Sequence, residues 1–84
     1  MRLDKYLKVS RLIKRRTIAN QVCDAGKVLV NDKIARASYD VKINDIIEFS
    51  FGGHNTKVEV LSIAPAIKKE EAQSMYRIIA ANWY

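Results

Sequence analysis

The spacing of apolar residues changes at Gly26, and this change limits the folds open to the chain. Before Gly26, apolar side chains recur three or four positions apart, as Leu3 and Leu7 do, which is the spacing of one helix face. After it, apolar and polar residues alternate, as in Ile47–Phe51, which is typical of half-buried strands. Because helical segments precede strands instead of alternating with them, the sequence predicts an α+β fold with an antiparallel sheet.

Two helices are predicted before the glycine. The first covers Arg2–Lys8, and Val9–Lys14 is expected to be a turn because its apolar and basic residues follow no clean period. The second helix begins at Arg15 or Arg16 and runs to Ala25. The glycine that follows ends this helix, since glycine adopts the left-handed C-terminal conformation without a Cβ penalty.

Four or five short strands are predicted to follow the helices. Asparagine and aspartate tolerate a positive φ, and paired glycines favour a hairpin, so these residue types mark the turns between strands. The expected strands include Lys27–Val30, Lys33–Ala35, Ile47–Phe51 and Thr56–Ile63, with turns at Asn31-Asp32, Asn44-Asp45 and Gly52-Gly53 and with Pro65 closing the sheet.

The last segment is predicted to be a short C-terminal helix. Its apolar residues fall at positions i, i+3, i+4 and i+7 and form one narrow stripe, made by Ala72, Met75, Tyr76 and Ile79. At 84 residues the chain is expected to form one small domain. We expect residues 65–84 to be a helical extension of the domain formed by residues 1–64.

All of the net charge lies in the first sixteen residues. They hold seven basic residues and one acid, Asp4, which gives the +6 of the whole chain, whereas the other 68 residues hold eight basic and eight acidic residues. A charge run is often only a solvated helix face. Here the compensating acids are missing from one segment alone, and such a positive patch favours a polyanion as the partner.

Few residues are suited to catalysis or to metal binding. His54 is expected in a solvated turn and Cys23 as a small apolar core residue, and one of each makes no structural zinc site. The three glycines match no phosphate-binding loop, and the scattered acids point to no catalytic pair. No apolar run approaches the ~20 residues of a membrane span. We therefore predict a cytoplasmic binding protein without enzymatic activity, cofactor, metal or membrane contact.

Several motifs resemble the RNA-binding domain named after small-subunit ribosomal protein S-four. That family packs two helices on a small antiparallel sheet, the alpha-L RNA-binding motif, and its helical face and following hairpin hold structured RNA. The family usually has glycine where this chain has Asp32 and Asn44, two residue types that can also form turns. The likeness spans about residues 1–50 and is carried by Arg2–Leu7, Ser10-Arg11, Arg16-Thr17, Ala25–Asn31 and Val41-Lys42 before Asp45–Ile47.

Within that family, the chain is similar to the stand-alone heat-shock-fifteen group and to its ribosome-associated quality control factor P members. The opening MRLDKYLKVSRLIKRRT, Lys68–Ala72 and Met75-Tyr76 carry this likeness. The resemblance implies binding to the large ribosomal subunit that carries stranded peptidyl-tRNA, with contacts to large-subunit ribosomal RNA and P-site tRNA. It also implies support of template-free alanine tailing by an RqcH-type partner. We expect the protein to act as a monomer.

Ten residues are predicted to contact RNA. Arg2 and Lys5 share one face of the first helix and are expected to touch one RNA, whereas Arg11, Arg15 and Arg16 are expected to touch another. Arginine suits both contacts, because its planar guanidinium binds phosphate through two donors and stacks on bases. The supporting contacts are expected from Lys8 and Lys14 and, at the sheet edge, from Lys27, Asn31 and Lys42.

Other functions remain compatible with the same residues. The chain could be a general ribosome-assembly or large-subunit recycling factor on the same fold. It could also be the detached RNA-binding subunit of an RNA-modifying enzyme, or an adaptor whose basic patch meets an acidic protein. Isolation of the native complexes separates these functions, since they differ in the particle or the partner that is recovered.

Overall fold

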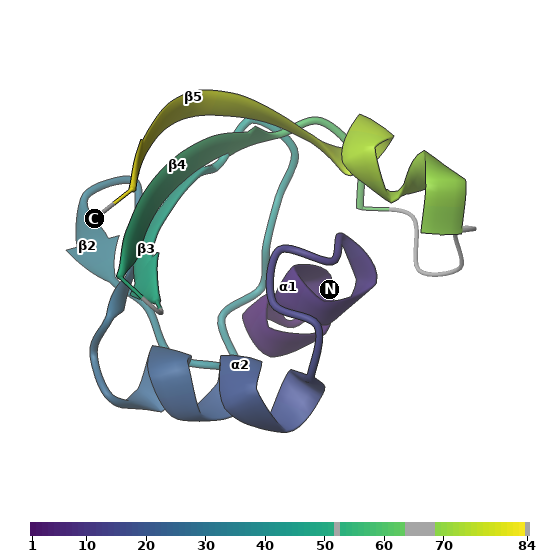
Figure 1. Cartoon of the computed structure of the whole chain (residues 1–84). Coiled ribbons are helices and arrows are strands. Elements are labelled where there is room, and N and C mark those ends of the chain that lie inside the picture. The colour runs from purple at the N-terminus through teal and green to yellow at the C-terminus, as the bar shows by residue number, and fades with distance from the viewer. Residues whose placement is uncertain (52, 64–68, 84) are drawn as a thin grey trace.

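A computed structural model describes residues 1–51, 53–63 and 69–83 of the chain. Two helices lie on the concave side of one curved five-stranded sheet (Figure 1). The elements, in chain order, are α1 (Leu3–Val9), α2 (Arg16–Asp24), β1 (Val28–Val30), β2 (Lys33–Ile34), β3 (Ile46–Phe51), β4 (His54–Val60), the 3₁₀ helix η1 (Lys69–Met75) and β5 (Tyr76–Trp83).

The two helices form where the sequence predicts them, with ends that differ by one residue. Helix α1 buries Leu3, Tyr6 and Leu7, which lie on one face because of their three- and four-residue spacing. Gly26 follows α2 with φ of 77°, which confirms that this glycine ends the helix in the left-handed conformation. Arg11 has φ of 63° just after α1, a conformation that is uncommon for residues other than glycine.

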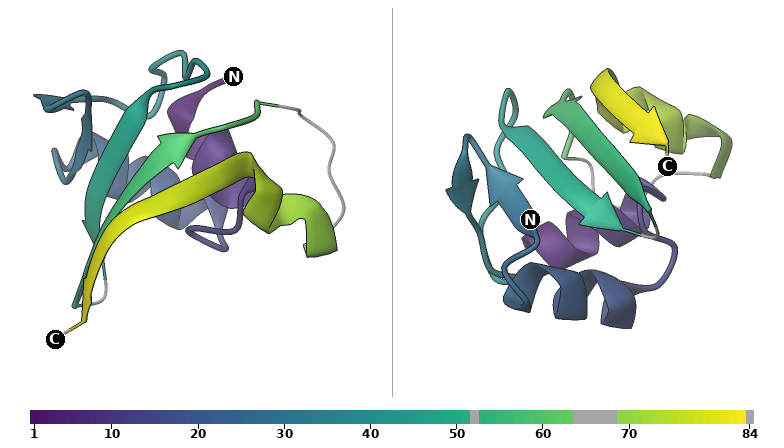
Figure 2. Two further views of the ribbon diagram at one scale, coloured as in Figure 1. Left: turned by 90° about the horizontal axis from the view of Figure 1, so that it is seen from above. Right: turned by 60° about the vertical axis from the view of Figure 1, so that its left-hand side comes forward.

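The sheet is antiparallel throughout and its strands are ordered β2-β1-β3-β4-β5. Val30 pairs with Lys33, and the two residues between them, Asn31 and Asp32, have φ of 52° and 68°. Positive φ at both positions is the requirement of a type I′ hairpin turn, so the predicted turn is confirmed. Figure 2 shows how the short β1–β2 hairpin stands at one end of the sheet and β5 at the other.

The predicted C-terminal helix is wrong beyond Met75. Only η1 is helical, and Tyr76–Trp83 forms strand β5, which pairs with β4 from Tyr76 opposite Val60 to Trp83 opposite His54. The apolar stripe that predicted a helix holds β-branched and aromatic residues, which also suit a strand. Pairing with β5 satisfies backbone groups of β4 that would otherwise form an open edge, and this long-range gain outweighs the local helical period.

One further sequence expectation differs from the structure, and two others lie partly or wholly outside the described residues. His54 is the first residue of β4 and does not lie in the turn where it was expected. The predicted hairpin at Gly52-Gly53 falls partly outside the described residues; Gly53 has φ of 82° and precedes a strand whose His54 pairs with Phe51 of β3. Pro65 also lies outside the described residues.

The core lies between the two helices and the inner face of the sheet. Inward-facing residues of β1, β3 and β4 contribute to it, together with the buried side chains of both helices and of the connecting loops, and the partly buried Tyr76 of β5 packs against it. Met75, at the junction of η1 and β5, is fully buried there, and its carbonyl accepts a 2.8 Å hydrogen bond from the buried Tyr6 hydroxyl. Tyr6 and Cys23 are therefore core residues, as predicted.

Candidate nucleic-acid interface

The basic side chains of the first sixteen residues lie on the surface around α1 and the start of α2. Lys5 is half-buried, and the other six are exposed, namely Arg2, Lys8, Arg11, Lys14, Arg15 and Arg16. Of the ion pairs formed within the described residues, only those of Arg2 and Arg16 involve this segment's side-chain cations. The segment thus presents most of its charge to solvent, where a polyanion can reach it.

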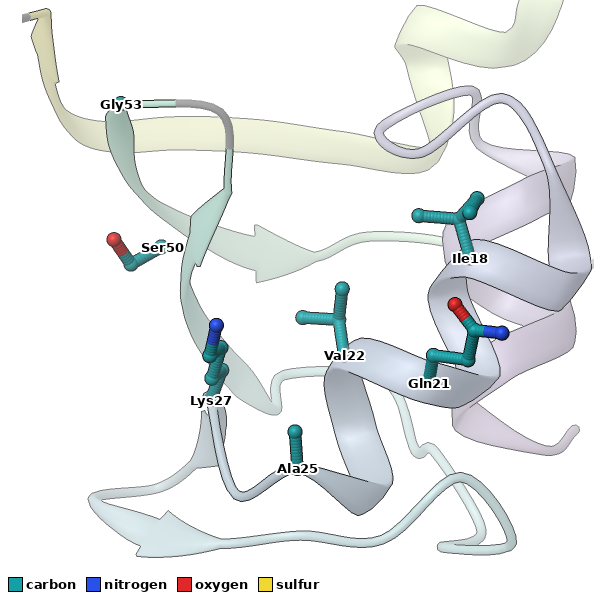
Figure 3. A pocket seen from close by; sticks show the side chains of 7 residues that line it. All are labelled: Ile18, Gln21, Val22, Ala25, Lys27, Ser50 and Gly53. Carbon is teal, nitrogen blue, oxygen red and sulfur yellow. The ribbon is translucent and has the colours of Figure 1, made fainter.

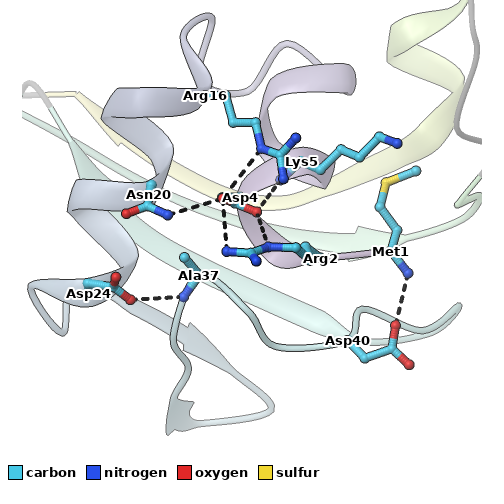
Figure 4. A network of polar contacts seen from close by, with 9 residues as sticks. All are labelled: Met1, Arg2, Asp4, Lys5, Arg16, Asn20, Asp24, Ala37 and Asp40. Carbon is cyan, nitrogen blue, oxygen red and sulfur yellow. Dashed lines mark hydrogen bonds and ion pairs between the residues drawn. The ribbon is translucent and has the colours of Figure 1, made fainter.

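Asp4 of α1 lies beneath this surface and joins its helix to α2 and to Arg2, which precedes α1 (Figure 4). Its side chain is only 3% exposed. Arg2 places Nε 3.2 Å from Oδ1 and Nη2 3.5 Å from Oδ2, and Arg16 places Nε 3.4 Å from Oδ2. The Asn20 amide donates to Oδ2 at 3.2 Å and the Lys5 backbone N–H donates to Oδ1 at 2.8 Å. These donors occupy the acceptor sites of the carboxylate.

The surroundings of Asp4 favour its charged form. Burial of the carboxyl raises its pKa, but the hydrogen bonds from Asn20, Arg2 and the Lys5 backbone, together with the charge of Arg16, lower the pKa more. The net result is a pKa below the ordinary value of 3.8. Asp4 therefore carries a negative charge at neutral pH and attracts both arginines.

The structure brings Arg2 and Arg16 to one place. The sequence predicted two different contact faces for them, because it places them on two different helices. Both guanidinium groups instead bind the same carboxylate, while their side chains remain 51% and 48% exposed. Arg2 uses two of its five N–H groups on Asp4 and Arg16 uses one, so both retain donors for a ligand.

A second cluster of polar contacts shapes the loops at the β1–β3 end of the sheet. The Asn31 amide donates to Asp45 Oδ1 at 3.1 Å and its oxygen accepts from the Ile46 backbone N–H at 3.0 Å. The Tyr39 hydroxyl and the Lys42 backbone N–H donate to Asp45 Oδ2 at 2.9 and 3.0 Å. Asn31 is thus engaged in holding the loop, whereas the Lys42 side chain is exposed.

A groove runs between α2 and the β3–β4 hairpin, and Lys27 stands at its rim (Figure 3). Ile18 and Val22 of α2 point into it, and Ser50 lies on the opposite wall. Of the described residues that line the groove, Lys27 alone is charged. Among those lining residues there is no acid–base pair that could act as a reaction centre.

Within the described ranges, no three His, Cys, Asp or Glu side chains gather in a way that could hold a metal ion. The helices in the same ranges are all too short and too polar to cross a membrane. Cys23 is buried, and burial, with the charges of Asp4 and Asp24, raises the pKa of its thiol to about 12. A thiol of this kind stays protonated at neutral pH and is a poor nucleophile.

Comparison with known proteins identifies the family. The S4 domain family matches residues 1–47. The chain is 52% identical to the RQC P-site tRNA stabilizing factor of Streptococcus pneumoniae over 80 residues, which are 95% of this chain and 91% of that protein. The chain belongs to the S4 domain family, in the group of RQC P-site tRNA stabilizing factors. The factor of the same name from Bacillus subtilis is 51% identical, over 94% of this chain and 92% of its own length.

Solved structures of S4 relatives share the fold. Heat shock protein 15 of Vibrio cholerae, described as trimeric, has a TM-score of 0.87 and 32% identity, covering 95% of this chain and 82% of its own. A hypothetical protein solved in solution has a TM-score of 0.76 and 31% identity, covering 95% of this chain and 98% of its own. The predicted likeness to the heat-shock-fifteen group is therefore confirmed, and so is the α+β arrangement of two helices on an antiparallel sheet.

Sequence reasoning missed the residues that hold the surface together. It treated Asp4 only as the one acid in a basic segment and did not single out Asn20, Tyr39 or Asp45 as partners of other residues. The isolation of Asp4 among seven basic residues was a usable signal, since a lone carboxylate in such a segment is well placed to bind several of them. The contacts of Tyr39 and Asp45 depend on loop geometry that the sequence does not specify.

Proposed function

We propose that this protein is an RNA-binding factor of ribosome-associated quality control that stabilises P-site tRNA on the large ribosomal subunit. The observation that carries the proposal is the 52% identity, over nearly the whole of both chains, to a factor named for P-site tRNA stabilization. The exposed basic surface around α1 and the start of α2 supports it, because RNA is held largely through phosphate contacts.

The proposed mechanism needs no chemical step and no cofactor. A surface that contacts large-subunit ribosomal RNA and tRNA at once binds better when the tRNA stands in the P site than when it stands elsewhere. By mass action this difference in affinity shifts the tRNA toward the P site. Held there, the peptidyl-tRNA becomes a substrate for template-free alanine tailing by an RqcH-type partner. We place this activity in the cytoplasm, where the subunits that carry stranded peptidyl-tRNA are found.

We assign the RNA contacts to two surfaces of the molecule. The first comprises the arginines and lysines of residues 2–16, with Arg2 and Arg16 acting side by side. The second lies along the β1–β3 end, where Lys27 and Lys42 are exposed and Asn31 acts by holding the loop in shape. We also propose that residues 1–64 and 65–84 form a single RNA-binding domain that acts as a monomer.

The decisive experiment recovers the protein with its native particles. Large subunits that carry peptidyl-tRNA should be enriched, whereas pre-ribosomal particles would instead support an assembly factor. A stable catalytic chain with little ribosome would support the subunit of an RNA-modifying enzyme. A complex that survives ribonuclease would support a protein adaptor.

An Arg16→Ala variant tests the surface itself, with Lys57→Ala as a control of equal charge. Lys57 lies on β4 between residues whose side chains face the core, so its own side chain lies on the sheet face away from the helices. Arg16→Ala should weaken binding to large subunits, and Lys57→Ala should not. The stability cost should stay below about 1 kcal/mol, as for other half-exposed ion pairs. Equal losses in both variants would contradict the assignment.

Salt dependence measures how many phosphates are bound. With about four to six contacts, the slope of log affinity against log salt should be roughly −3 to −5, at about 0.7–0.9 per phosphate. Arg16→Ala should make the slope shallower by about one such contact. A slope near zero for the parent protein would exclude binding through phosphates.

A further inference from the structure

The carboxylate beneath the basic surface has an unusual place in a protein that binds a polyanion. Asp4 is the one acid among the first sixteen residues, and its charge opposes the binding of phosphate. Yet its side chain is 3% exposed, while the side chains of Arg2 and Arg16 above it are about half exposed. RNA that approaches this surface therefore meets arginine and not the carboxylate.

Without that carboxylate, the two arginines would be neither ordered nor close together. A long basic side chain on a surface samples many rotamers, and ordering it on binding costs free energy. Two like charges also repel at short distance. Contacts of 3.2 and 3.5 Å from Arg2 and of 3.4 Å from Arg16 fix both groups on one acceptor before any ligand arrives. Asn20, from the next turn of α2, holds the same carboxylate at 3.2 Å.

We propose that Asp4 is a positioning residue that holds Arg2 and Arg16 as one two-armed site for an RNA phosphate. The free N–H groups of two neighbouring guanidiniums can bind the oxygens of one phosphate, or of two successive ones, through several donors. Because this site uses the RNA-binding surface, the inference rests on the proposed function. It adds that the arginines act as a pair and that an acid improves their binding of RNA.

The sign of one substitution separates positioning from simple charge. Asp4→Asn keeps the size of the side chain and raises the net charge by one. If the surface worked only through its total charge, the variant would bind RNA more tightly. If Asp4 works by ordering Arg2 and Arg16, the variant will bind more weakly in spite of its extra charge.

Binding of purified large ribosomal subunits is measured for Asp4→Asn and for Asp32→Asn, a control with the same charge change. Asp32 lies exposed in a type I′ turn that asparagine also fits. We expect Asp4→Asn to bind about tenfold more weakly than the parent, and Asp32→Asn to bind as well or better. Equal or tighter binding by Asp4→Asn would overturn the positioning role.

The Arg2→Ala/Arg16→Ala double variant shows through which residues Asp4 acts. In that background, adding Asp4→Asn should cause no further loss of binding, whereas an undiminished tenfold loss would show that Asp4 acts elsewhere. If the double variant itself binds like the parent, the assignment of these arginines to RNA fails, and the proposal about Asp4 fails with it. If the double variant loses binding and Asp4→Asn does not, only the positioning role fails.

A measurement on the unaltered protein covers the case in which Asp4→Asn does not fold. The Nε–H protons of arginine side chains exchange with water at rates that NMR can follow. Those of Arg2 and Arg16, which are bonded to Asp4, should exchange at least about tenfold more slowly than those of the exposed Arg11 and Arg15. Equal exchange at all four arginines would show that Asp4 orders neither, and would overturn the proposal.

Discussion

Replacing Met75 with alanine tests whether the end of η1, directly before the last strand, belongs to the core. Met75 is fully buried and packs in the same cluster as the helical residues Leu3 and Leu7. The variant keeps the Met75 carbonyl, so the hydrogen bonds from the Tyr6 hydroxyl and from the Leu61 and Ser62 backbone N–H groups can persist. What is lost is the packing of one buried side chain, which costs about 2–4 kcal/mol for methionine.

Ile79→Ala is the matched control, four residues further along the chain in β5. Ile79 is 45% exposed, so its truncation should cost less than about 1 kcal/mol. For a domain of this size, 1 kcal/mol shifts the thermal midpoint by about 4–8 °C. Met75→Ala should therefore lower the midpoint, measured by far-ultraviolet circular dichroism, by roughly 8–32 °C, and Ile79→Ala should lower it by only a few degrees.

The comparison also separates the strand from the helix that the sequence predicted. A C-terminal helix would place Met75 and Ile79 on one apolar stripe and bury both, so both alanine variants would be costly. In the structure Met75 is the last residue of η1 and is buried, whereas Ile79 lies on β5 and is exposed. Similar losses of stability in the two variants would refute the reasoning, and so would a Met75→Ala variant as stable as the parent.

Two further predictions concern titration and reactivity. The pKa of Asp4 lies below its ordinary 3.8 in the folded protein, so the ionised carboxylate stabilises the fold above pH 3.8, and this contribution is lost as the pH falls through the lowered pKa. The free energy of unfolding, measured with urea between pH 5 and 2, should therefore depend less on pH in Asp4→Asn than in the parent protein. An unchanged pH dependence would contradict the contacts of Asp4. The Cys23 thiol, with its pKa raised to about 12, should resist alkylation at pH 8 until urea unfolds the protein, and rapid labelling of the native protein would contradict its burial.

Local sequence patterns predicted most of the fold because they act over a few residues. The spacing of Leu3 and Leu7, the glycine after α2 and the Asn31-Asp32 turn each depend on their own backbone preferences, and each is confirmed. Strand β5 could not be predicted in the same way. Whether its segment becomes helix or strand depends on the open edge of β4, which is a property of the assembled sheet.

The candidate surface was predictable in composition but not in arrangement. The concentration of charge before Thr17 identified the basic residues without any structure. Spacing along two helices suggested two contact faces, because it places residues around one helix but does not show how two helices meet. The packing of the two helices brings Arg2 and Arg16 to the buried Asp4. Arg16 and Asp4 are 12 residues apart in the sequence.

The hydrogen bond from the Tyr6 hydroxyl to the Met75 carbonyl joins residues 69 positions apart, so its two partners are synthesised at different times. The ribosome delivers the N-terminus first, at about 5–20 residues per second, so the basic segment precedes Met75 by roughly 3–14 s. Throughout that interval α1 lacks part of the apolar cover that the finished core gives it. The family match over residues 1–47 thus marks a stretch of shared sequence and not a unit that completes its own core, because Val58, Val60 and Met75 must arrive before α1 is fully enclosed.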